Sequence, residues 1–147
     1  MTANSILLVE DSADDVELTI RAFRNANAQQ EIYVARDGTE AVERLLGSAT
    51  VPPPRYLPAL VLLDLKLPGL NGFDVLSRIR SDARTRFLPV VILTSSTETS
   101  DLVLGYQLGA NSYVRKPVSF REFLGTTQQI AGYWLSLNVV PPIAPAT

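Results

Sequence analysis

Acidic side chains follow two short apolar stretches of the sequence. Residues 5–9 are followed by Glu10 and Asp11, and residues 59–63 are followed by Asp64. If the fold gathers these three carboxylates, they repel one another and need a cation, and a hard divalent ion such as Mg²⁺ suits their oxygens. An aspartate can also attack a phosphoryl donor and form an aspartyl phosphate. These residue types therefore predict magnesium-assisted phosphoryl chemistry, with Asp64 as the acceptor.

A hydroxyl group and an ammonium group follow two other apolar stretches. Thr94 comes directly after residues 89–93, and Lys116 comes shortly after residues 112–114. Phosphoryl transfer depends mainly on positioning and on neutralising the charge of the equatorial oxygens. Because Lys116 supplies positive charge and Thr94 supplies a hydrogen-bond donor, both side chains suit a phosphoryl group on Asp64.

Missing residue types exclude several classes of chemistry. The 147 residues contain no cysteine and no histidine, which excludes disulfides, histidine-ligated zinc and a phosphohistidine carrier on this chain. The formal net charge of -2 provides no basic field for nucleic acid. No stretch approaches the ~20 apolar residues of a membrane span, and the first residues lack the pattern of a signal peptide. We therefore expect a cytoplasmic protein with no nucleic-acid partner and no membrane association.

The apolar stretches predict strands that alternate with amphipathic helices. Their valines, isoleucines and leucines are continuous rather than alternating, which indicates a parallel sheet with helices on both faces. In such a sheet, ligands bind outside the carboxyl ends of the strands, where the acids, the threonine and the lysine would meet. The expected strands are residues 5–9, 32–35, 59–63, 89–93 and 112–114. One expected helix begins at residue 12, and the other four span residues 38–46, 71–80, 97–108 and 120–137.

These residues together resemble the receiver domain of response regulators, which has the fold of the chemotaxis regulators. The matching motifs are Glu10-Asp11, LLDLKLPGLNG around Asp64, Thr94-Ser95 and YVRKP at residues 113–117. The resemblance covers about residues 4–131. We expect residues 1–147 to form one domain, with 132–147 as the end of a long last helix and a loosely packed or disordered proline-rich tail.

The resemblance implies an α/β fold and a set of site residues. The implied fold is a doubly wound sheet of five parallel strands in the order 2-1-3-4-5. Asp64 would be phosphorylated by a sensor histidine kinase, and Mg²⁺ would be bound by Asp64, by Asp11 directly and by Glu10 through a water molecule. The other implied roles are a Mg²⁺-binding carbonyl at Lys66, phosphoryl contacts from Thr94, Lys116 and the Ser95 N–H, a switch formed by Thr94 and Tyr113, and a cis peptide between Lys116 and Pro117.

Two further features resemble the stand-alone response regulators that partner phytochrome-type sensor kinases. The proline-rich segment 51–58 is longer than the corresponding connection of a plain receiver domain, and the last helix contains Tyr133, Trp134 and Leu135. The resemblance implies a phosphoacceptor switch rather than an enzyme with an external substrate. Without a DNA-binding segment, its output would pass through contact with a downstream protein that the sequence does not name.

Other readings of the same residues remain open. A phosphohydrolase with an aspartyl nucleophile needs a second aspartate two positions later, where this chain has Lys66. A flavin carrier needs a phosphate cradle after the first strand, where Glu10 and Asp11 would repel phosphate. A receiver-like scaffold that is never phosphorylated is the third alternative. Tyr113 could serve packing alone, and Asp14 and Asp15 suit the dipole of the first helix better than the metal.

The sequence also predicts a homodimer and a long-lived phosphoryl group. The expected dimer interface is the face made by the fourth helix, the fifth strand and the last helix, because phosphorylation would change the conformation beneath it. The last helix also carries more apolar side chains than its contact with the core requires, and a large exposed apolar surface usually marks an interface. The alternative is that these side chains fold back onto their own domain. Slow self-dephosphorylation is expected because neither Lys66 nor Ser96 would orient a water molecule firmly. The surplus apolar residues are Tyr133, Trp134, Leu135, Leu137, Val139 and Val140.

Overall fold

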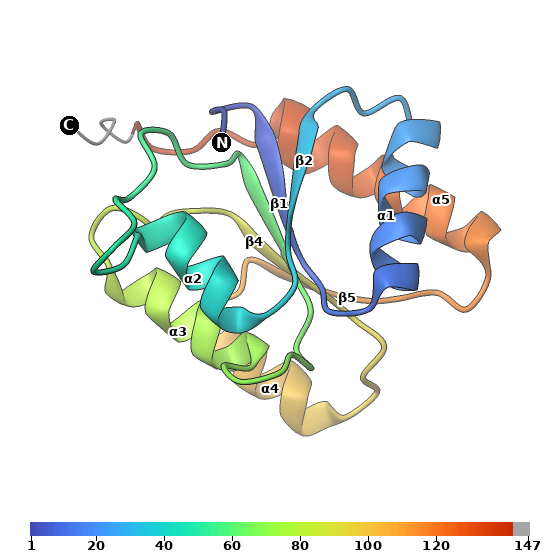
Figure 1. Cartoon of the computed structure of the whole chain (residues 1–147). Coiled ribbons are helices and arrows are strands. Elements are labelled where there is room, and N and C mark those ends of the chain that lie inside the picture. The colour runs from blue at the N-terminus through green and yellow to red at the C-terminus, as the bar shows by residue number, and fades with distance from the viewer. Residues whose placement is uncertain (143–147) are drawn as a thin grey trace.

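Five parallel strands form the centre of the molecule, in the order β2-β1-β3-β4-β5 (Figure 1). The structure is a computed structural model that describes residues 1–142. The parallel sheet and its strand order confirm the predicted fold class and the predicted order 2-1-3-4-5. The strands are β1 Ser5–Val9, β2 Glu31–Ala35, β3 Leu60–Leu63, β4 Val90–Thr94 and β5 Ser112–Arg115. The helices are α1 Ala13–Asn25, α2 Gly38–Leu46, α3 Gly72–Ser81, α4 Thr99–Gln107 and α5 Phe120–Gly132.

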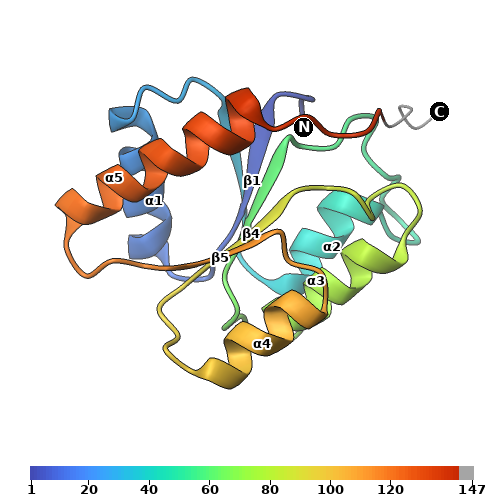
Figure 2. The same ribbon diagram turned by 180° about the vertical axis from the view of Figure 1, so that it is seen from behind.

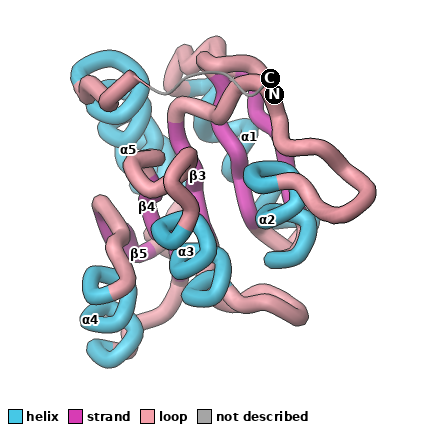
Figure 3. The backbone as a smooth tube through the Cα atoms, turned by 90° about the vertical axis from the view of Figure 1, so that its left-hand side faces the viewer, coloured by secondary structure: helices cyan, strands magenta, loops and turns pink. Residues whose placement is uncertain are grey.

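The helices cover both faces of the sheet. Helices α1 and α5 lie together on one face, and α2, α3 and α4 lie on the other (Figures 1 and 2). The same layering is visible with the strands in magenta between the cyan helices (Figure 3). Every residue of β1, β3 and β4 is buried. Burial on both faces explains why these strands are continuous apolar runs rather than alternating ones.

Successive residues of the central strands point into two separate cores. Leu7 and Val9 of β1 join the core beneath α2 and α3, whereas Ile6 and Leu8 join the core beneath α1 and α5. This alternation follows from the two-residue repeat of a strand. Because both cores are filled, a shift of register would move large apolar side chains between them, so the register of the strand ends is well determined.

Side-chain caps fix where most helices begin. Ser12 Oγ accepts a hydrogen bond from the Asp15 N–H at the start of α1. Asn71 and Asp74 form a reciprocal capping box at the start of α3. By contrast, the residue before α4, Glu98, makes no side-chain cap, and α4 begins at Thr99 rather than at residue 97 as predicted.

The last helix departs from the predicted single helix over residues 120–137. Helix α5 ends at Gly132, and one wider turn of π-helix follows at Tyr133–Leu137. Trp134 and Leu135 pack against the core beneath α1 and α5, so this part of the apolar surplus does fold back. Within residues 1–142, none of the helices has the length and apolar character needed to cross a membrane.

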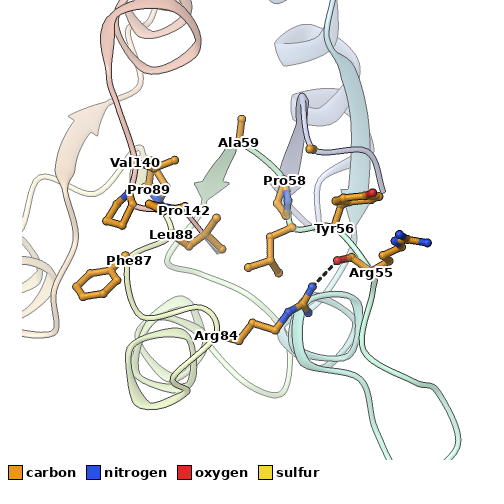
Figure 4. A pocket seen from close by; sticks show the side chains of 13 residues that line it. Arg55, Tyr56, Pro58, Ala59, Arg84, Phe87, Leu88, Pro89, Val140 and Pro142 are labelled. Carbon is orange, nitrogen blue, oxygen red and sulfur yellow. Dashed lines mark hydrogen bonds between the residues drawn. The ribbon is translucent and has the colours of Figure 1, made fainter. Parts of the chain in front are cut away.

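The first residues of the proline-rich tail lie beside the loops that precede β3 and β4. Val140, Pro141 and Pro142 line a cavity together with residues of the loops before β3 and β4 (Figure 4). The expectation of a loosely packed or disordered tail stays a prediction for these three residues, which line the cavity but are themselves exposed. The remaining part of that expectation, residues 143–147, lies outside the described residues.

Candidate functional site

The carboxyl ends of the strands meet at one edge of the sheet. The Asp64 N–H donates to the Val9 carbonyl oxygen at 3.0 Å, and the Lys116 N–H donates to the Thr94 carbonyl oxygen at 2.7 Å. These bonds continue the parallel pairing one residue past the strands, where the sequence changes from apolar to polar. The fold therefore gathers Glu10, Asp64, Thr94 and Lys116 at one edge, as the sequence predicted.

Three carboxylates cluster at this edge. Oxygens of Glu10, Asp11 and Asp64 all lie within 4.8 Å of one another. Glu10 is only 2% exposed, and burial raises its pKa to about 7 despite the hydrogen bond from Lys116. An all-oxygen site of crowded carboxylates, one of them buried, fits a hard divalent cation, which would offset their repulsion.

Lys116 is the positive charge nearest to the cluster. Its Nζ donates a hydrogen bond to Glu10 Oε2 at 2.6 Å and lies 3.5 Å from Asp15 Oδ2 and 3.8 Å from Asp64 Oδ2. Burial by itself would lower the pKa of Lys116, but the Glu10 hydrogen bond and the charges of Asp64, Glu10 and Asp15 raise it overall. The ammonium group is therefore protonated at neutral pH.

The contact between Asp15 and Lys116 was missed by the sequence analysis. The sequence favours a helix-dipole role for Asp15, which lies in the first turn of α1, and the structure shows that Asp15 also faces Lys116. The sequence does contain a signal for this contact: α1 begins soon after Glu10 and Asp11, so its first turn must lie over the same edge of the sheet. The Leu65 N–H, which donates to Asp64 Oδ1 at 2.8 Å, was missed as well. A backbone donor of this kind leaves no signal in the residue types.

The loop after β4 holds the predicted hydroxyl groups. Thr94 is buried, and its Oγ1 accepts a hydrogen bond from the Ser96 N–H at 3.2 Å. Ser96 Oγ donates in turn to Asp101 Oδ2 at 2.6 Å. Ser95 and Lys66 are exposed on the loops that follow β4 and β3. All these residues lie at the same edge as Asp64, while their individual roles remain predictions.

Tyr113 lies inward between the sheet and α4. Its ring packs against the core beneath α2 and α3, and a Cβ added to Gly105 of α4 would lie 3.3 Å from Tyr113 Cδ2. The Tyr113 hydroxyl is buried and has no hydrogen-bond partner among the described residues. Tyr113 pairs with Ile92 on the neighbouring strand β4, two residues before Thr94, and this position suits both packing and a switch.

Comparison with known proteins identifies the family. A family model described as the response regulator receiver domain matches residues 6–128. The chain belongs to the response regulator receiver family. It is 42% identical over 139 residues to the probable methanogenesis regulatory protein FilR2 of Methanothrix harundinacea, covering 92% of this chain and 86% of that protein. It is 34% identical over 137 residues to the response regulator Rcp1 of Synechocystis sp., covering 92% of each.

Solved structures support the same membership. The Mn²⁺-bound form of Rcp1 has a TM-score of 0.82 at 32% identity and covers 95% of this chain and 99% of that chain. The bacteriophytochrome response regulator AtBRR has a TM-score of 0.73 at 44% identity and covers 95% of this chain and 100% of that chain. The predicted resemblance to phytochrome-linked regulators is confirmed. The receiver is therefore a component of two-component signalling, in which sensor kinases phosphorylate such domains.

One implied feature of the receiver site is wrong. All peptide bonds among residues 1–142 are trans, including the bond between Lys116 and Pro117. The cis form was implied by the resemblance alone. The trans form of an X-Pro bond is intrinsically favoured by about 0.5–1 kcal/mol, and here the trans chain still brings the Lys116 ammonium to Glu10.

A glycine keeps α3 close to the acceptor loop of the receiver. A Cβ at Gly72 would lie 2.3 Å from the Asp64 carbonyl oxygen and 2.7 Å from Leu65 Cα. We expect Gly72→Ala to lower the free energy of unfolding by about 1–3 kcal/mol, because the backbone must move apart. Urea denaturation measures this change. Gly125→Ala in α5 is the control, since nothing lies within 4 Å of its added Cβ. Equal effects of the two substitutions would contradict the close approach.

Proposed function

We propose that this chain is a phosphorylation switch in which Asp64 accepts a phosphoryl group from a bacteriophytochrome-type sensor histidine kinase. The observation that carries the proposal is the position of the Asp64 carboxylate. It lies within 4.8 Å of the Glu10 and Asp11 carboxylates, and its Oδ2 lies 3.8 Å from the Lys116 ammonium. The similarity to Rcp1 and to a bacteriophytochrome response regulator supports the kind of donor.

The two oxygens of Asp64 have different surroundings. The Leu65 N–H holds Oδ1, whereas Oδ2 faces Lys116. An Asp64 oxygen forms a bond to phosphorus while the bond from phosphorus to the donor's imidazole nitrogen breaks, and that electron pair stays on the imidazole. The Lys116 ammonium offsets charge on the phosphoryl oxygens. The Thr94 hydroxyl and the Ser95 N–H donate hydrogen bonds to the same oxygens.

The acidic cluster would hold Mg²⁺ beside the acceptor. Asp11 and Asp64 are the direct carboxylate ligands in this proposal, the Lys66 carbonyl is a further ligand, and Glu10 acts through water. The hydrogen bond from Lys116 to Glu10 supports the indirect role, because one Glu10 oxygen is already occupied. When bound, the cation supplies positive charge next to the transferred group. The Mn²⁺-bound form of Rcp1 supports a divalent metal at such a site.

Removal of the metal tests the function directly. The chain is mixed with a bacteriophytochrome-type kinase that carries radiolabelled phosphohistidine, in Mg²⁺ or in excess EDTA. We expect one phosphoryl group per chain in Mg²⁺, loss of transfer in EDTA, and recovery when Mg²⁺ is restored. Undiminished transfer in EDTA would refute the metal's part. If neither this kinase nor acetyl phosphate labels the chain in Mg²⁺, the proposed function fails.

The output surface is proposed to be a homodimer interface made by α4, β5 and α5. Val103 and Tyr106 of α4 are large apolar side chains that are 48% and 51% exposed. Phosphorylation of Asp64 would draw Thr94 towards the phosphoryl group, and the ring of Tyr113 would follow beneath this face. Trp134 and Leu135 pack on their own domain, but Tyr133 and Leu137 are 49% and 72% exposed, so apolar area is available both on α4 and on the turn that follows α5.

Light scattering tests the dimer. We expect the wild-type chain to be dimeric at micromolar concentration after treatment with acetyl phosphate, and Tyr106→Glu to be monomeric because a charge would enter the apolar interface. Leu18→Glu is the matched control, because Leu18 is 39% exposed but lies on α1, which is not one of the three elements of this face. A monomeric wild type in both phosphorylation states would refute the dimer, and a dimeric Tyr106→Glu would refute the interface.

A further inference from the structure

The loop between β4 and α4 carries a chain of hydrogen bonds from Thr94 into the first turn of α4 (Figure 2). The Ser96 N–H donates to Thr94 Oγ1 at 3.2 Å, and Ser96 Oγ donates to Asp101 Oδ2 at 2.6 Å. Ser96 is 5% exposed, so water competes poorly for these bonds. A single residue therefore links the Asp101 carboxylate to the buried Thr94 hydroxyl.

The start of α4 differs from an ordinary capping box. In α3, Asp74 is the third helical residue and accepts a hydrogen bond from the N–H of Asn71, the residue before the helix. Asp101 has the same position in α4, but the Ser96 hydroxyl lies between it and the preceding residue. This hydroxyl accepts from the Glu98 N–H at 3.2 Å and donates to Asp101. The Asp101 side chain thus fixes the loop as well as the end of the helix.

The Thr94 side chain is held through its backbone and through its hydroxyl. Its carbonyl oxygen accepts from the Lys116 N–H at 2.7 Å, which fixes the backbone, and a threonine side chain has few rotamers. The Ser96 N–H occupies one lone pair of the hydroxyl oxygen, so the hydroxyl hydrogen points away from Ser96 and stays available for donation. A donor held ready in this way stabilises developing charge without first having to reorganise.

We propose that Asp101 is a positioning residue for phosphoryl transfer to Asp64. Asp101 fixes Ser96, and Ser96 holds the Thr94 hydroxyl so that its hydrogen donates to a phosphoryl oxygen. The inference rests on the proposed function, in which Thr94 contacts the phosphoryl group. The alternative is that Asp101 only stabilises the start of α4, where a negative charge favours the helix dipole. In that case its effect would not depend on the Thr94 hydroxyl.

The rate at which acetyl phosphate labels the full chain in Mg²⁺ tests the positioning role. We expect Asp101→Ala to lower this rate about three- to tenfold, less than the ~10²–10³ of a lost donor, because the hydroxyl remains but is held less firmly. Asp101→Asn should keep most of the rate, since its amide oxygen can still accept from Ser96 Oγ. Glu122→Ala is the matched control, because Glu122 is the exposed acid at the same position of α5, and it should keep the wild-type rate.

A double-mutant cycle with Thr94 separates positioning from helix capping. In Thr94→Val, which has a similar shape but no hydroxyl, Asp101→Ala should cause no further loss of rate. Ser96→Ala breaks the same link, so it should slow labelling by a similar factor, and it provides the same cycle if Asp101→Ala fails to fold.

Several results would overturn the positioning role. An unchanged rate in Asp101→Ala would leave Asp101 as a helix cap, and a faster rate would make it a restraint that opposes phosphorylation. Equal slowing in Thr94→Val and in the wild-type background would show that Asp101 does not act through Thr94. These outcomes refute the positioning role alone, because the wild-type chain is labelled in each of them. If the wild-type chain is not labelled, the proposed function fails and this inference fails with it.

Discussion

Replacing Asp64 with asparagine should reduce phosphoryl labelling of the chain to background, with both a sensor kinase and acetyl phosphate as donors. The amide has nearly the shape of the carboxylate but is not a nucleophile towards phosphorus. Its carbonyl oxygen can still accept the hydrogen bond from the Leu65 N–H, so the acceptor loop should keep its conformation. Autoradiography after gel separation, together with the mass of the intact chain, measures the labelling.

Asp14→Asn is the matched control for this prediction. Asp14 is an exposed carboxylate in the first turn of α1, close to the site in sequence but outside the cluster of Glu10, Asp11 and Asp64. We expect it to be labelled like the wild type. Labelling of Asp64→Asn at the wild-type rate would show that another carboxylate is the acceptor, and Asp11 would then be the first to test.

The sheet could be predicted because its signals are local. Strand β1 at Ser5–Val9 and helix α2 at Gly38–Leu46 have the bounds that the sequence indicated. A continuous apolar run ends where the strand reaches the edge of the sheet, and the next residue lies at that edge. The polar residues that follow such runs, Glu10 and Asp64 among them, could therefore be placed at one site without knowledge of any contact. The strand order, by contrast, came from the resemblance and not from the residues.

Features that depend on side-chain conformation or on distant segments could not be predicted. The Lys116 ammonium could form an ion pair with any of four nearby acidic side chains. Only the packed structure shows that Glu10 is its closest partner and Asp15 its second closest. The wide turn at Tyr133–Leu137 decides which aromatic side chains face the core, and helical spacing alone assumed a regular α-helix. The cavity beside Arg84 joins loops separated by many residues and the tail. Because no sequence periodicity links such segments, the sequence pattern does not predict that they lie side by side.

Removing only one partner of the ion pair between Lys116 and Glu10 should destabilise the fold strongly, because the other partner is left as an unpaired buried charge. The Lys116 side chain is 15% exposed and the Glu10 side chain is 3% exposed, so water screens the pair poorly. Lys116→Met keeps an apolar stem of similar length but leaves the Glu10 carboxylate buried beside Asp64 without a cation. Removing one partner of a buried pair typically costs 3–5 kcal/mol, and we expect a loss of about 3 kcal/mol in the free energy of unfolding. Urea denaturation in EDTA, where no divalent metal replaces the lost charge, measures the effect.

A second substitution separates the lost pair from lost packing. In Glu10→Gln/Lys116→Met no uncompensated charge remains at the pair, so most of the lost stability should return. Addition of Mg²⁺ to Lys116→Met should also restore stability, because a cation bound to Glu10, Asp11 and Asp64 stabilises the folded state. The exposed pair of Arg21 with Glu17 provides the control: its side chains are 57% and 74% exposed, and Arg21→Met should cost less than about 1 kcal/mol. If the double variant is as unstable as Lys116→Met, the lost stability does not come from an uncompensated Glu10 charge, and the electrostatic account of this site edge is wrong.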